Sequence, residues 1–347
     1  MHIAFEKGLS EILHYQKRSS KEMAQIKNIG VLTSGGDSPG MNAAIRAVVR
    51  TAVYYDFEVT GIRRGYEGLI KGEFFPMDRK SVSNIIQRGG TILKTARSEQ
   101  FRTVEGRKQA YEQLQKGNVD ALITIGGDGT FRGAETFGRE FNFPIIALPG
   151  TIDNDLIGTD FTIGYDTAIN TAIEAIDKIR DTAESHARLF IVEVMGRDSG
   201  LIAIRTGIGA GAEAVLIPDT SSNMEALFDR LKYGRKDKSS RIVMVAEGEE
   251  PGTAIEIGQV IKEKFPDYDT RVSVLGHIQR GGRPSCMDRV LASRLGVAAV
   301  EALKDGHYNE MIGLVHDQIT YTPLEKSIKH HITINPEFLK VVEILSL

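Results

Sequence analysis

Three strand-like segments in the first half of this chain each end in a loop of glycine, hydroxyl or carboxylate residues. The segments are IGVLT from Ile29, ALITI from Ala121 and IIAL from Ile145, and the loops after them are SGGDSPG, GGDGT and PGTIDND. Helix-forming stretches lie between these units. Strands that alternate with helices predict an α/β fold with largely parallel sheets covered by helices on both faces. In such a sheet ligands bind at the carboxyl ends of the strands, where these loops lie.

The second half of the chain repeats the alternation. Further strand-like segments are LFIVEV, AEAVLI, RIVMVA and RVSVLG, and we predict helices over 166–180, near Leu201 and over 224–233, 255–265 and 288–303. We also predict a helix over 81–87 and a short amphipathic helix in the C-terminal PEFLKVVEILSL. A length of 347 residues indicates two lobes or one large α/β unit.

Composition excludes several classes of function. The formal net charge of -3 gives no argument for nucleic acid or an anionic membrane surface, and no apolar run is long enough to span a bilayer. The single cysteine, Cys286, allows no intrachain disulfide and no multi-cysteine zinc site, and it fits a reducing cytoplasm. We therefore expect a cytoplasmic protein with neither nucleic acid nor a membrane as partner.

The first two dozen residues differ from the rest of the chain. Glu6, Lys7 and Glu11 lie where a secretory signal would need an apolar centre, so we expect an N-terminal extension over 1–25 and no signal peptide. Met23 directly precedes the first strand-like segment, and we expect it to be the native start. Mass spectrometry of the natural N-terminus tests this expectation, and an intact Met1 or His2 end would contradict it.

The two glycine loops have the geometry of phosphate sites. Glycines between a strand and a helix let the backbone approach phosphate, and the helix N-terminus adds free N–H groups. SGGDSPG lacks both the GxGxxG spacing and the lysine of GxxxxGK[ST], so by itself it is equally consistent with a tight turn. In GGDGT, Asp128 is placed to hold Mg²⁺, although Asp128 or Thr130 could instead cap the next helix.

The third loop carries groups suited to proton transfer. In PGTIDND, one of Asp153 and Asp155 can take a proton from a substrate hydroxyl while the other helps to place a metal, and Thr151 adds a hydroxyl. Taken alone, the loop is better explained as a solvated surface loop. The two glycine loops before it favour a site for phosphoryl chemistry.

Five motifs together resemble one family. GGDSPGMNAAIR, IGGDGT, PGTIDND, VEVMGR and LGHIQRGG, in this order, resemble the bacterial ATP-dependent 6-phosphofructokinases from about Lys27 to the 320s. GGDGT alone also occurs in NAD kinases and diacylglycerol-type lipid kinases, but the other four motifs point away from both. The resemblance implies a homotetramer with two Rossmann-like lobes and an active site in the cleft between them. It implies an ATP-binding lobe of 26–164 plus 277–326, and a fructose 6-phosphate-binding lobe of 165–276 plus 327–347.

The family's roles are carried over motif by motif. Asp153 would take the proton from the sugar 1-hydroxyl, with Thr151 and Asp155 beside it, and Arg197 would stabilise charge on the transferred phosphoryl group. The resemblance implies that the nucleotide contacts are Gly35, Tyr66, Arg97, Ser98, Gly127, Asp128, Gly129 and Thr130, with Asp128 holding Mg²⁺. It implies that the sugar-phosphate contacts are Thr151, Asp153, Arg188, Met195, Gly196, Arg197, Glu247, Arg271, His277 and Arg280. Arg188 and Arg271 would come from a neighbouring subunit.

Without the motifs, the same residues have plainer explanations. Arg97 and Arg197 would be solvated surface arginines, and His277 would be a structural histidine.

The phosphoryl donor is the family's main ambiguity. Pyrophosphate-using relatives carry Asp where this chain has Gly129 and Lys where it has Gly150, and the two glycines favour ATP because they leave room for a nucleotide. A pyrophosphate-dependent enzyme, a non-catalytic nucleotide-sensing paralogue and a related substrate such as tagatose 6-phosphate remain the alternatives.

A further set of residues matches the family's effector pocket. Arg46 and Arg50 lie four residues apart on a predicted helix, so their charges repel by a few tenths of a kcal/mol, and a bound anion would relieve this. The resemblance implies a subunit-interface pocket for ADP and phosphoenolpyruvate built from Arg46, Arg50, Arg79, Arg180, Glu213, Lys236 and Lys238. Asn84 departs from the aspartate of a well-studied branch, which leaves the sign and size of regulation open.

Overall fold

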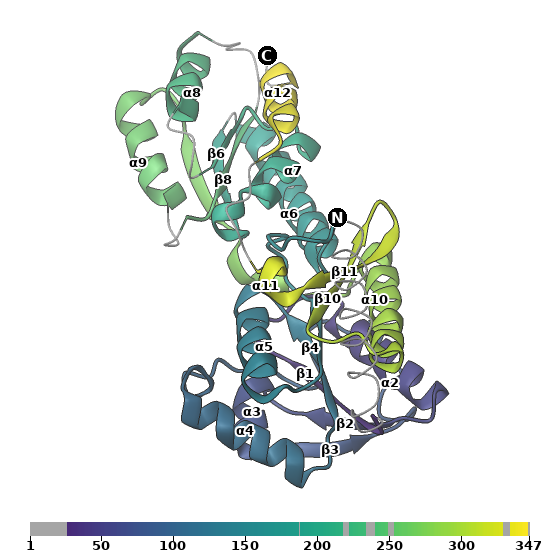
Figure 1. The fold of residues 1–347 in the computed structure, drawn as a ribbon. Coiled ribbons are helices and arrows are strands. Elements are labelled where there is room, and N and C mark those ends of the chain that lie inside the picture. Colours follow the sequence, from purple (N-terminus) through teal and green to yellow (C-terminus); the bar gives the residue numbers. More distant parts are fainter. Residues whose placement is uncertain are drawn as a thin grey trace, which may run out of the picture.

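The computed structural model describes residues 26–186, 188–217, 222–233, 240–248, 253–328 and 334–345, and it confirms the α/β architecture in two lobes (Figure 1). The N-terminal extension and the proposed start at Met23 lie outside these ranges. The larger lobe is built on a sheet of order β11-β10-β5-β4-β1-β2-β3, and the smaller lobe on a sheet of order β7-β8-β6-β9.

The larger lobe is parallel at its centre and antiparallel at both edges. Its strands are β1 (Asn28–Thr33), β2 (Glu58–Ile62), β3 (Phe74–Met77), β4 (Ala121–Gly126), β5 (Ile145–Pro149), β10 (Glu310–Val315) and β11 (Gln318–Pro323). The edge strands β3 and β11 run antiparallel to β2 and β10. Helices α2 (Met41–Tyr54) and α10 (Cys286–Asp305) pack on one face, and α3 (Gly65–Lys71), α4 (Val104–Lys116) and α5 (Asp128–Phe141) on the other. Every residue of β1, β4 and β5 is buried, because helices cover both faces of these strands.

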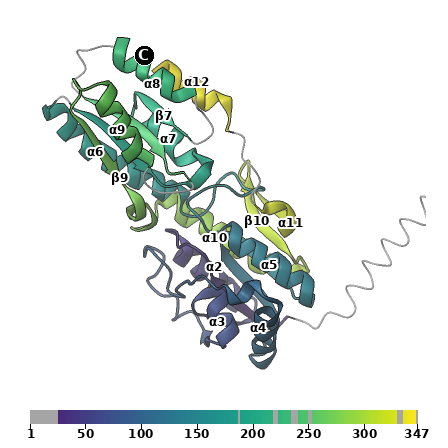
Figure 2. The same cartoon turned by 90° about the vertical axis from the view of Figure 1, so that its left-hand side faces the viewer.

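The smaller lobe repeats this layering with a wholly parallel sheet. Its strands are β6 (Leu189–Val194), β7 (Ala214–Leu216), β8 (Arg241–Ala246) and β9 (Thr270–Val274). Helices α6 (Tyr165–His186), α7 (Leu201–Gly209) and α12 (Pro336–Leu345) cover one face, and α8 (Ser222–Tyr233) and α9 (Thr253–Lys264) the other. The C-terminal helix α12 lies beside α7 in both views, with Phe338, Leu339 and Val342 against the core (Figure 2).

Some local predictions were wrong. The helix predicted over 81–87 is a series of turns: Asn84 has a positive φ of 53°, and the Asp78 carboxylate accepts the backbone N–H groups of Lys80 and Ser81. Such side-chain bonds compete with the helix ladder. The pattern also missed α3, β3 and the β10–β11 hairpin, whose strands are only partly buried. None of the helices within the described ranges combines the length and apolar character needed to cross a bilayer.

One buried carboxylate joins the lobes where the chain passes from one to the other. Asp288, near the start of α10, accepts backbone N–H bonds from Gly164 and Thr167, each at 2.8 Å, and also the Thr167 hydroxyl. Gly164 has φ +106°, and a Cβ there would lie 2.6 Å from Ser38. Asp288 accepts N–H groups at the first turn of α6, so it caps the N-terminus of this helix although it lies far away in the sequence.

Candidate active site between the lobes

The three loops predicted from the sequence meet at the carboxyl ends of β1, β4 and β5, which are neighbours in the sheet. The Ser34 N–H donates to the Ile125 carbonyl at 3.0 Å, and the Thr130 hydroxyl donates to the Ser34 carbonyl at 3.0 Å. Gly127 lies so close to the third loop that a Cβ there would be 3.3 Å from the Thr151 Cβ. The loops therefore form one continuous surface of backbone groups.

Helix α5 begins at Asp128, within the second loop. Its N-cap is Gly127, which has no side chain to cap the helix, and the Thr130 hydroxyl is directed to the first loop. Asp128 pairs with Arg132 at 2.9 Å, one turn further along α5. The N-terminus of α5 thus lies at the loops, and the end of a helix that carries its free N–H groups is where anions bind.

The carboxylate loop is buried, so the explanation as a solvated surface loop is wrong. Thr151, Asp153 and Asp155 are 6%, 4% and 2% exposed. The Asp153 N–H donates to the Thr151 hydroxyl at 3.2 Å, while the Thr151 carbonyl accepts a bond of 2.6 Å from the Thr162 hydroxyl. Among the described residues, Asp153 Oδ1 has no hydrogen-bond partner. A buried carboxylate oxygen without a donor is rare in native structures and indicates a functional atom.

Asn154 and Thr162 fix this loop, although no sequence motif predicts that role for them. Asn154 has φ 52°. Its side chain donates to the Asp160 carbonyl at 3.1 Å and accepts the Thr162 N–H at 2.7 Å. Asparagine tolerates this left-handed conformation better than most residues, and its amide closes the loop at the same time.

The smaller lobe supplies the groups that face Asp153. The turn after β6 carries Arg197, whose Nε lies 3.6 Å from Asp153 Oδ2 and whose side chain is 55% exposed. Arg197 has φ 50° and follows Gly196, which has φ 125°. The Met195 N–H donates to the Gln279 side chain at 2.9 Å, which ties this turn to the segment after β9. The structure thus brings Asp153 and Arg197 together from different lobes.

Glu247, at the end of β8, completes this group. Its N–H donates to the Val194 carbonyl at 2.9 Å, and one carboxylate oxygen lies 3.4 Å from the Arg197 N–H. Burial raises the pKa of Glu247 above its ordinary value, and the nearby charge of Asp153 raises it further.

The predicted nucleotide contacts gather on the other side of the glycine loops. Tyr66 donates its hydroxyl to the Thr130 carbonyl at 2.6 Å, and its ring stacks on Phe101 at 4.0 Å. Burial raises the pKa of Tyr66, which keeps its hydroxyl protonated. Ser98 donates to Glu67 at 2.8 Å, Thr95 donates to the Gly35 carbonyl at 2.6 Å, and Arg97 is exposed.

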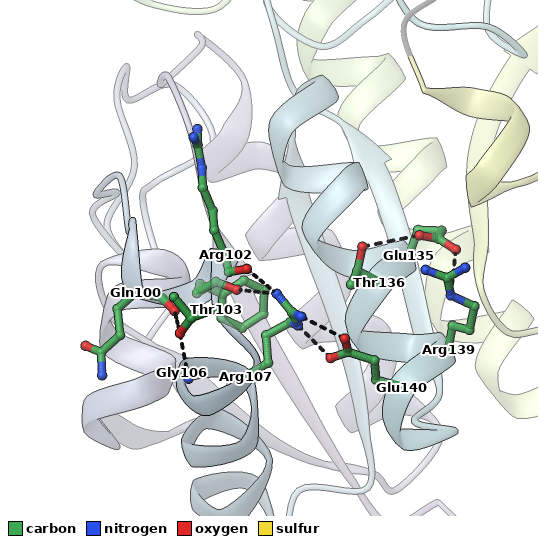
Figure 3. Close-up of polar contacts among 10 residues, drawn as sticks. Gln100, Arg102, Thr103, Gly106, Arg107, Glu135, Thr136, Arg139 and Glu140 are labelled. Carbon is green, nitrogen blue, oxygen red and sulfur yellow. Dashed lines mark hydrogen bonds and ion pairs between the residues drawn. The ribbon is translucent and has the colours of Figure 1, made fainter.

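A buried arginine holds the segment that carries Arg97 and Ser98 (Figure 3). Arg107, near the start of α4, donates to both carboxylate oxygens of Glu140, at 2.6 and 2.7 Å. Its remaining guanidinium nitrogen donates to the Phe101 and Arg102 carbonyls at 3.1 and 2.7 Å. Since Glu140 lies at the far end of α5, the clamp fixes residues 97–102 relative to the helix that starts at Asp128. No pattern in the sequence predicts this contact.

The predicted phosphate-binding cations form two separate groups. His277 is exposed, and Arg280 donates to the Asp37 carbonyl in the first glycine loop at 3.3 Å; both follow β9. Arg188 and Arg271 both pair with Asp269, at 2.7 and 2.9 Å, and lie where β6 and β9 begin. The two groups are therefore at opposite ends of the same strands.

The predicted effector residues also divide between the lobes. Arg46 and Arg50 lie on α2, and burial, followed by the charge of Arg50, lowers the pKa of Arg46. Arg50 also lines a shallow hollow of about 250 Å³ between α2 and α10. Arg79 is exposed after β3, while Arg180 on α6 donates to the Ala210 carbonyl and Glu213 precedes β7. Lys236 and Lys238 lie outside the described residues.

No cluster of three or more His, Cys, Asp or Glu residues suited to a metal occurs in the part of the chain that the structure describes. Magnesium, however, is often held by one or two carboxylates together with substrate phosphates. Asp128, at the start of α5, is a carboxylate suited to that kind of site.

Comparison with known proteins gives a consistent picture. The family model Phosphofructokinase matches residues 28–303. The chain is 54% identical over 326 residues to ATP-dependent 6-phosphofructokinase 2 of Bacteroides thetaiotaomicron, covering 94% of this chain and all of that protein. It is 53% identical over 323 residues to ATP-dependent 6-phosphofructokinase 1 of Thermus thermophilus, covering 93% and 100%. The solved structure of phosphofructokinase from Saccharomyces cerevisiae superposes with a TM-score of 0.81 at 36% identity, over 92% of this chain and 46% of the longer yeast chain.

Proposed function

The chain belongs to the phosphofructokinase family, and from that premise we propose that it transfers the γ-phosphoryl group of ATP to the 1-hydroxyl of fructose 6-phosphate. The relatives that are about 54% identical over nearly the whole chain are ATP-dependent 6-phosphofructokinases, which supports a role for this chain in glycolysis. The observation that carries the mechanism is the pairing of a buried carboxylate, Asp153, with Arg197 from the other lobe at 3.6 Å.

Asp153 acts as the base in this proposal. Its Oδ1 has no partner among the described residues, so it is free to accept the proton of the sugar 1-hydroxyl. Arg197 faces the same carboxylate and places a cation where charge develops on the transferred phosphoryl group. Phosphoryl transfer depends mostly on in-line placement and on such charges, which explains why both lobes contribute to one site.

The glycine loops hold the nucleotide phosphates. Gly35, Gly127 and Gly129 offer backbone N–H groups, whereas the Thr130 N–H already donates to the Gly127 carbonyl at 2.9 Å. Tyr66, Arg97 and Ser98 are the proposed contacts beside these loops. A Mg²⁺ ion held by Asp128, with Asp155 nearby, would neutralise charge on the phosphoryl oxygens. A Cβ at Gly129 would have no atom within 4 Å, so the space beside the loop is open, in agreement with a nucleotide donor.

The sugar phosphate is proposed to bind between subunits. His277 and Arg280 follow β9 on the side of Asp153, while Arg188 and Arg271 lie at the start of the strands. Because β9 has five residues and each strand residue rises about 3.3 Å, these groups are too far apart to hold one phosphate within a chain. This separation supports an oligomer in which Arg188 and Arg271 serve a neighbour's site, and we propose the homotetramer that the family resemblance implies.

Regulation by ADP and phosphoenolpyruvate is proposed at the same kind of interface. The anion would neutralise Arg46, Arg50 and Arg79 of one subunit together with Arg180, Lys236 and Lys238 of another, beside Glu213. Changing Arg50 to Ala should abolish both effects on the rate, and unchanged activation and inhibition would argue against the pocket.

We propose the lobe boundaries predicted from the sequence. The sheet order supports them, since β10 and β11 rejoin the sheet of β1–β5 and α12 packs against the lobe of β6–β9. A cytoplasmic location is likewise proposed, and the single cysteine is consistent with a reducing compartment.

The deciding experiment is steady-state turnover of the purified protein on fructose 6-phosphate and Mg²⁺, with ATP and pyrophosphate as separate donors. We expect fructose 1,6-bisphosphate with ATP alone. Turnover with pyrophosphate alone would refute the donor assignment, and no turnover with either would favour another sugar phosphate or a nucleotide-sensing role. Replacing fructose 6-phosphate by tagatose 6-phosphate in the same assay tests the acceptor.

A further inference from the structure

Ser199 forms a buried link between the two halves of the active site. It is 4% exposed and lies in the smaller lobe, at the end of the short 3-10 helix Arg197–Ser199. Its hydroxyl oxygen is 3.0 Å from the carbonyl of Asp153 in the larger lobe and 2.8 Å from the carbonyl of Gly196 in its own lobe. The same side chain therefore touches the loop of the base and the turn of Arg197.

The position of each contact determines what Ser199 can control. Asp153 bears the carbonyl that Ser199 bonds and also the carboxylate proposed as the base, so restraining its backbone restrains its side chain. The Gly196 carbonyl lies in the peptide bond that leads into Arg197, a non-glycine residue with φ 50°. Left-handed conformations persist at such residues only where the surrounding structure enforces them.

The base loop is held at two carbonyls by two buried hydroxyls. Thr162, 1% exposed, donates to the Thr151 carbonyl from within the larger lobe, whereas Ser199 reaches the Asp153 carbonyl from the smaller lobe. Thr162 can therefore fix the shape of the loop but not its position relative to Arg197. Fixing the loop relative to Arg197 requires a contact from the smaller lobe.

A purely local role would explain part of the geometry. The Ser199 oxygen also lies 3.5 Å from the Leu201 N–H, and together with the Gly196 contact this resembles the side-chain bonding of an ordinary turn. The contact with Asp153, in another lobe and 46 residues away in sequence, has no part in such a turn. The hydroxyl has one proton, which it shares between the Gly196 carbonyl at 2.8 Å and the Asp153 carbonyl at 3.0 Å, so part of its bonding crosses to the larger lobe.

We infer that Ser199 is a positioning residue that fixes Asp153 relative to Arg197, so that the base and the cation are both correctly placed at the transferred phosphoryl group. The inference rests on the proposed function. A misplacement of about 1 Å in a catalytic group can lower the rate about a hundredfold, so the loss of one short contact is measurable.

The test is a double-mutant cycle between Ser199 and Asp153. We expect Ser199→Ala to lower kcat for ATP and fructose 6-phosphate about 10- to 100-fold, with both KM values changed less than about threefold. In an Asp153→Asn background the same change should lower the residual kcat less than about twofold, because the positioned group is already gone. Ser199→Thr, which keeps the hydroxyl, should recover most of the lost activity.

Ser327→Ala is the matched control. Ser327 is fully buried and donates to the Leu324 carbonyl at 2.9 Å, but it lies in the short helix α11 (Leu324–Ser327), after β11. The Ser327→Ala variant therefore loses a buried bond from a serine hydroxyl to a backbone carbonyl outside the active site. It should leave kcat within about twofold of the unmodified enzyme.

Three results would overturn the inference: an unchanged kcat for Ser199→Ala, an equal loss in both Asp153 backgrounds, or an equal loss in Ser327→Ala. Should Ser199→Ala not fold, Ser199→Cys, with a weaker donor, takes its place in the same cycle and is judged by the same results. The unmodified enzyme is assayed first, and its failure to turn over would refute the proposed function instead.

Discussion

Replacing Arg107 by Ala should weaken both the stability of the larger lobe and its affinity for ATP. The Arg107 side chain is 9% exposed and that of Glu140 is 29% exposed, and the guanidinium makes four hydrogen bonds (Figure 3). Removing one partner of a buried ion pair costs about 3–5 kcal/mol. We take the lower end, about 3 kcal/mol, because the exposed part of Glu140 can regain water.

The expected change in melting temperature follows from that free energy. At about 2–4 °C per kcal/mol for domains of 150–250 residues, a loss of about 3 kcal/mol lowers Tm by about 6–12 °C. The Phe101 and Arg102 carbonyls lose their donor, so the segment that carries Arg97 and Ser98 loosens. We expect KM for ATP to rise about tenfold, equivalent to about 1.4 kcal/mol, while KM for fructose 6-phosphate stays within about twofold.

Helix α5, which carries Glu140, also supplies the control variant. Arg139 pairs with Glu135 at 3.4 Å, one turn before Glu140, but its side chain is 72% exposed. Exposed pairs of this spacing contribute about 0.5 kcal/mol or less, so Arg139→Ala should change Tm by no more than about 2 °C. Thermal unfolding and initial rates on both variants test the reasoning. Equal shifts in Tm would refute the burial argument, and a lower Tm with an unchanged KM for ATP would refute the positioning of residues 97–102.

Three further predictions concern charge and space. The pKa of Glu247 is higher in the folded protein than its value of about 4.5 in the unfolded chain, so its contribution to stability is present below pH 4.5 and is lost as pH rises through the folded pKa. Glu247→Gln should therefore raise Tm at pH 7–8 but not at pH 4. Calorimetry across that pH range tests this. Gly129→Asp should lower ATP turnover about tenfold, because the side chain would occupy space that the glycine leaves for the nucleotide, and should leave Tm unchanged, because no protein atom lies within 4 Å of its Cβ. Gly150→Ala should lower Tm, because its Cβ would lie 2.9 Å from Ile125. A lower Tm for Gly129→Asp would contradict this reasoning. Asp288→Asn turns an amide donor toward the N–H group of either Gly164 or Thr167 and should cost about 1–3 kcal/mol in chemical denaturation. A smaller loss would show that the N-terminus of α6 does not depend on this carboxylate.

The main features of the fold could be predicted because they depend on local pattern. Apolar runs such as Ile145–Leu148 become buried strands wherever helices cover both faces of a sheet, and all of β5 is buried. Edge strands were missed because their formation depends on a partner: β11 is exposed or half-buried throughout, and among the described strands it pairs only with β10. The helix predicted over 81–87 was wrong because hydrogen bonds from Asp78 and the positive φ of Asn84 outweigh a weak helical pattern.

By itself, the sequence determined which chemical groups the protein has and which strand ends carry them. The glycine loops and PGTIDND are local signals, because phosphate binding needs glycines and N–H groups that are close along the chain. Only the tertiary structure decided how groups from different lobes meet: Arg197 at 3.6 Å from Asp153, and Ser199 between Asp153 and Gly196. Such contacts depend on the packing of two separate cores, and a serine that bonds a distant carbonyl looks, in sequence, like any other serine.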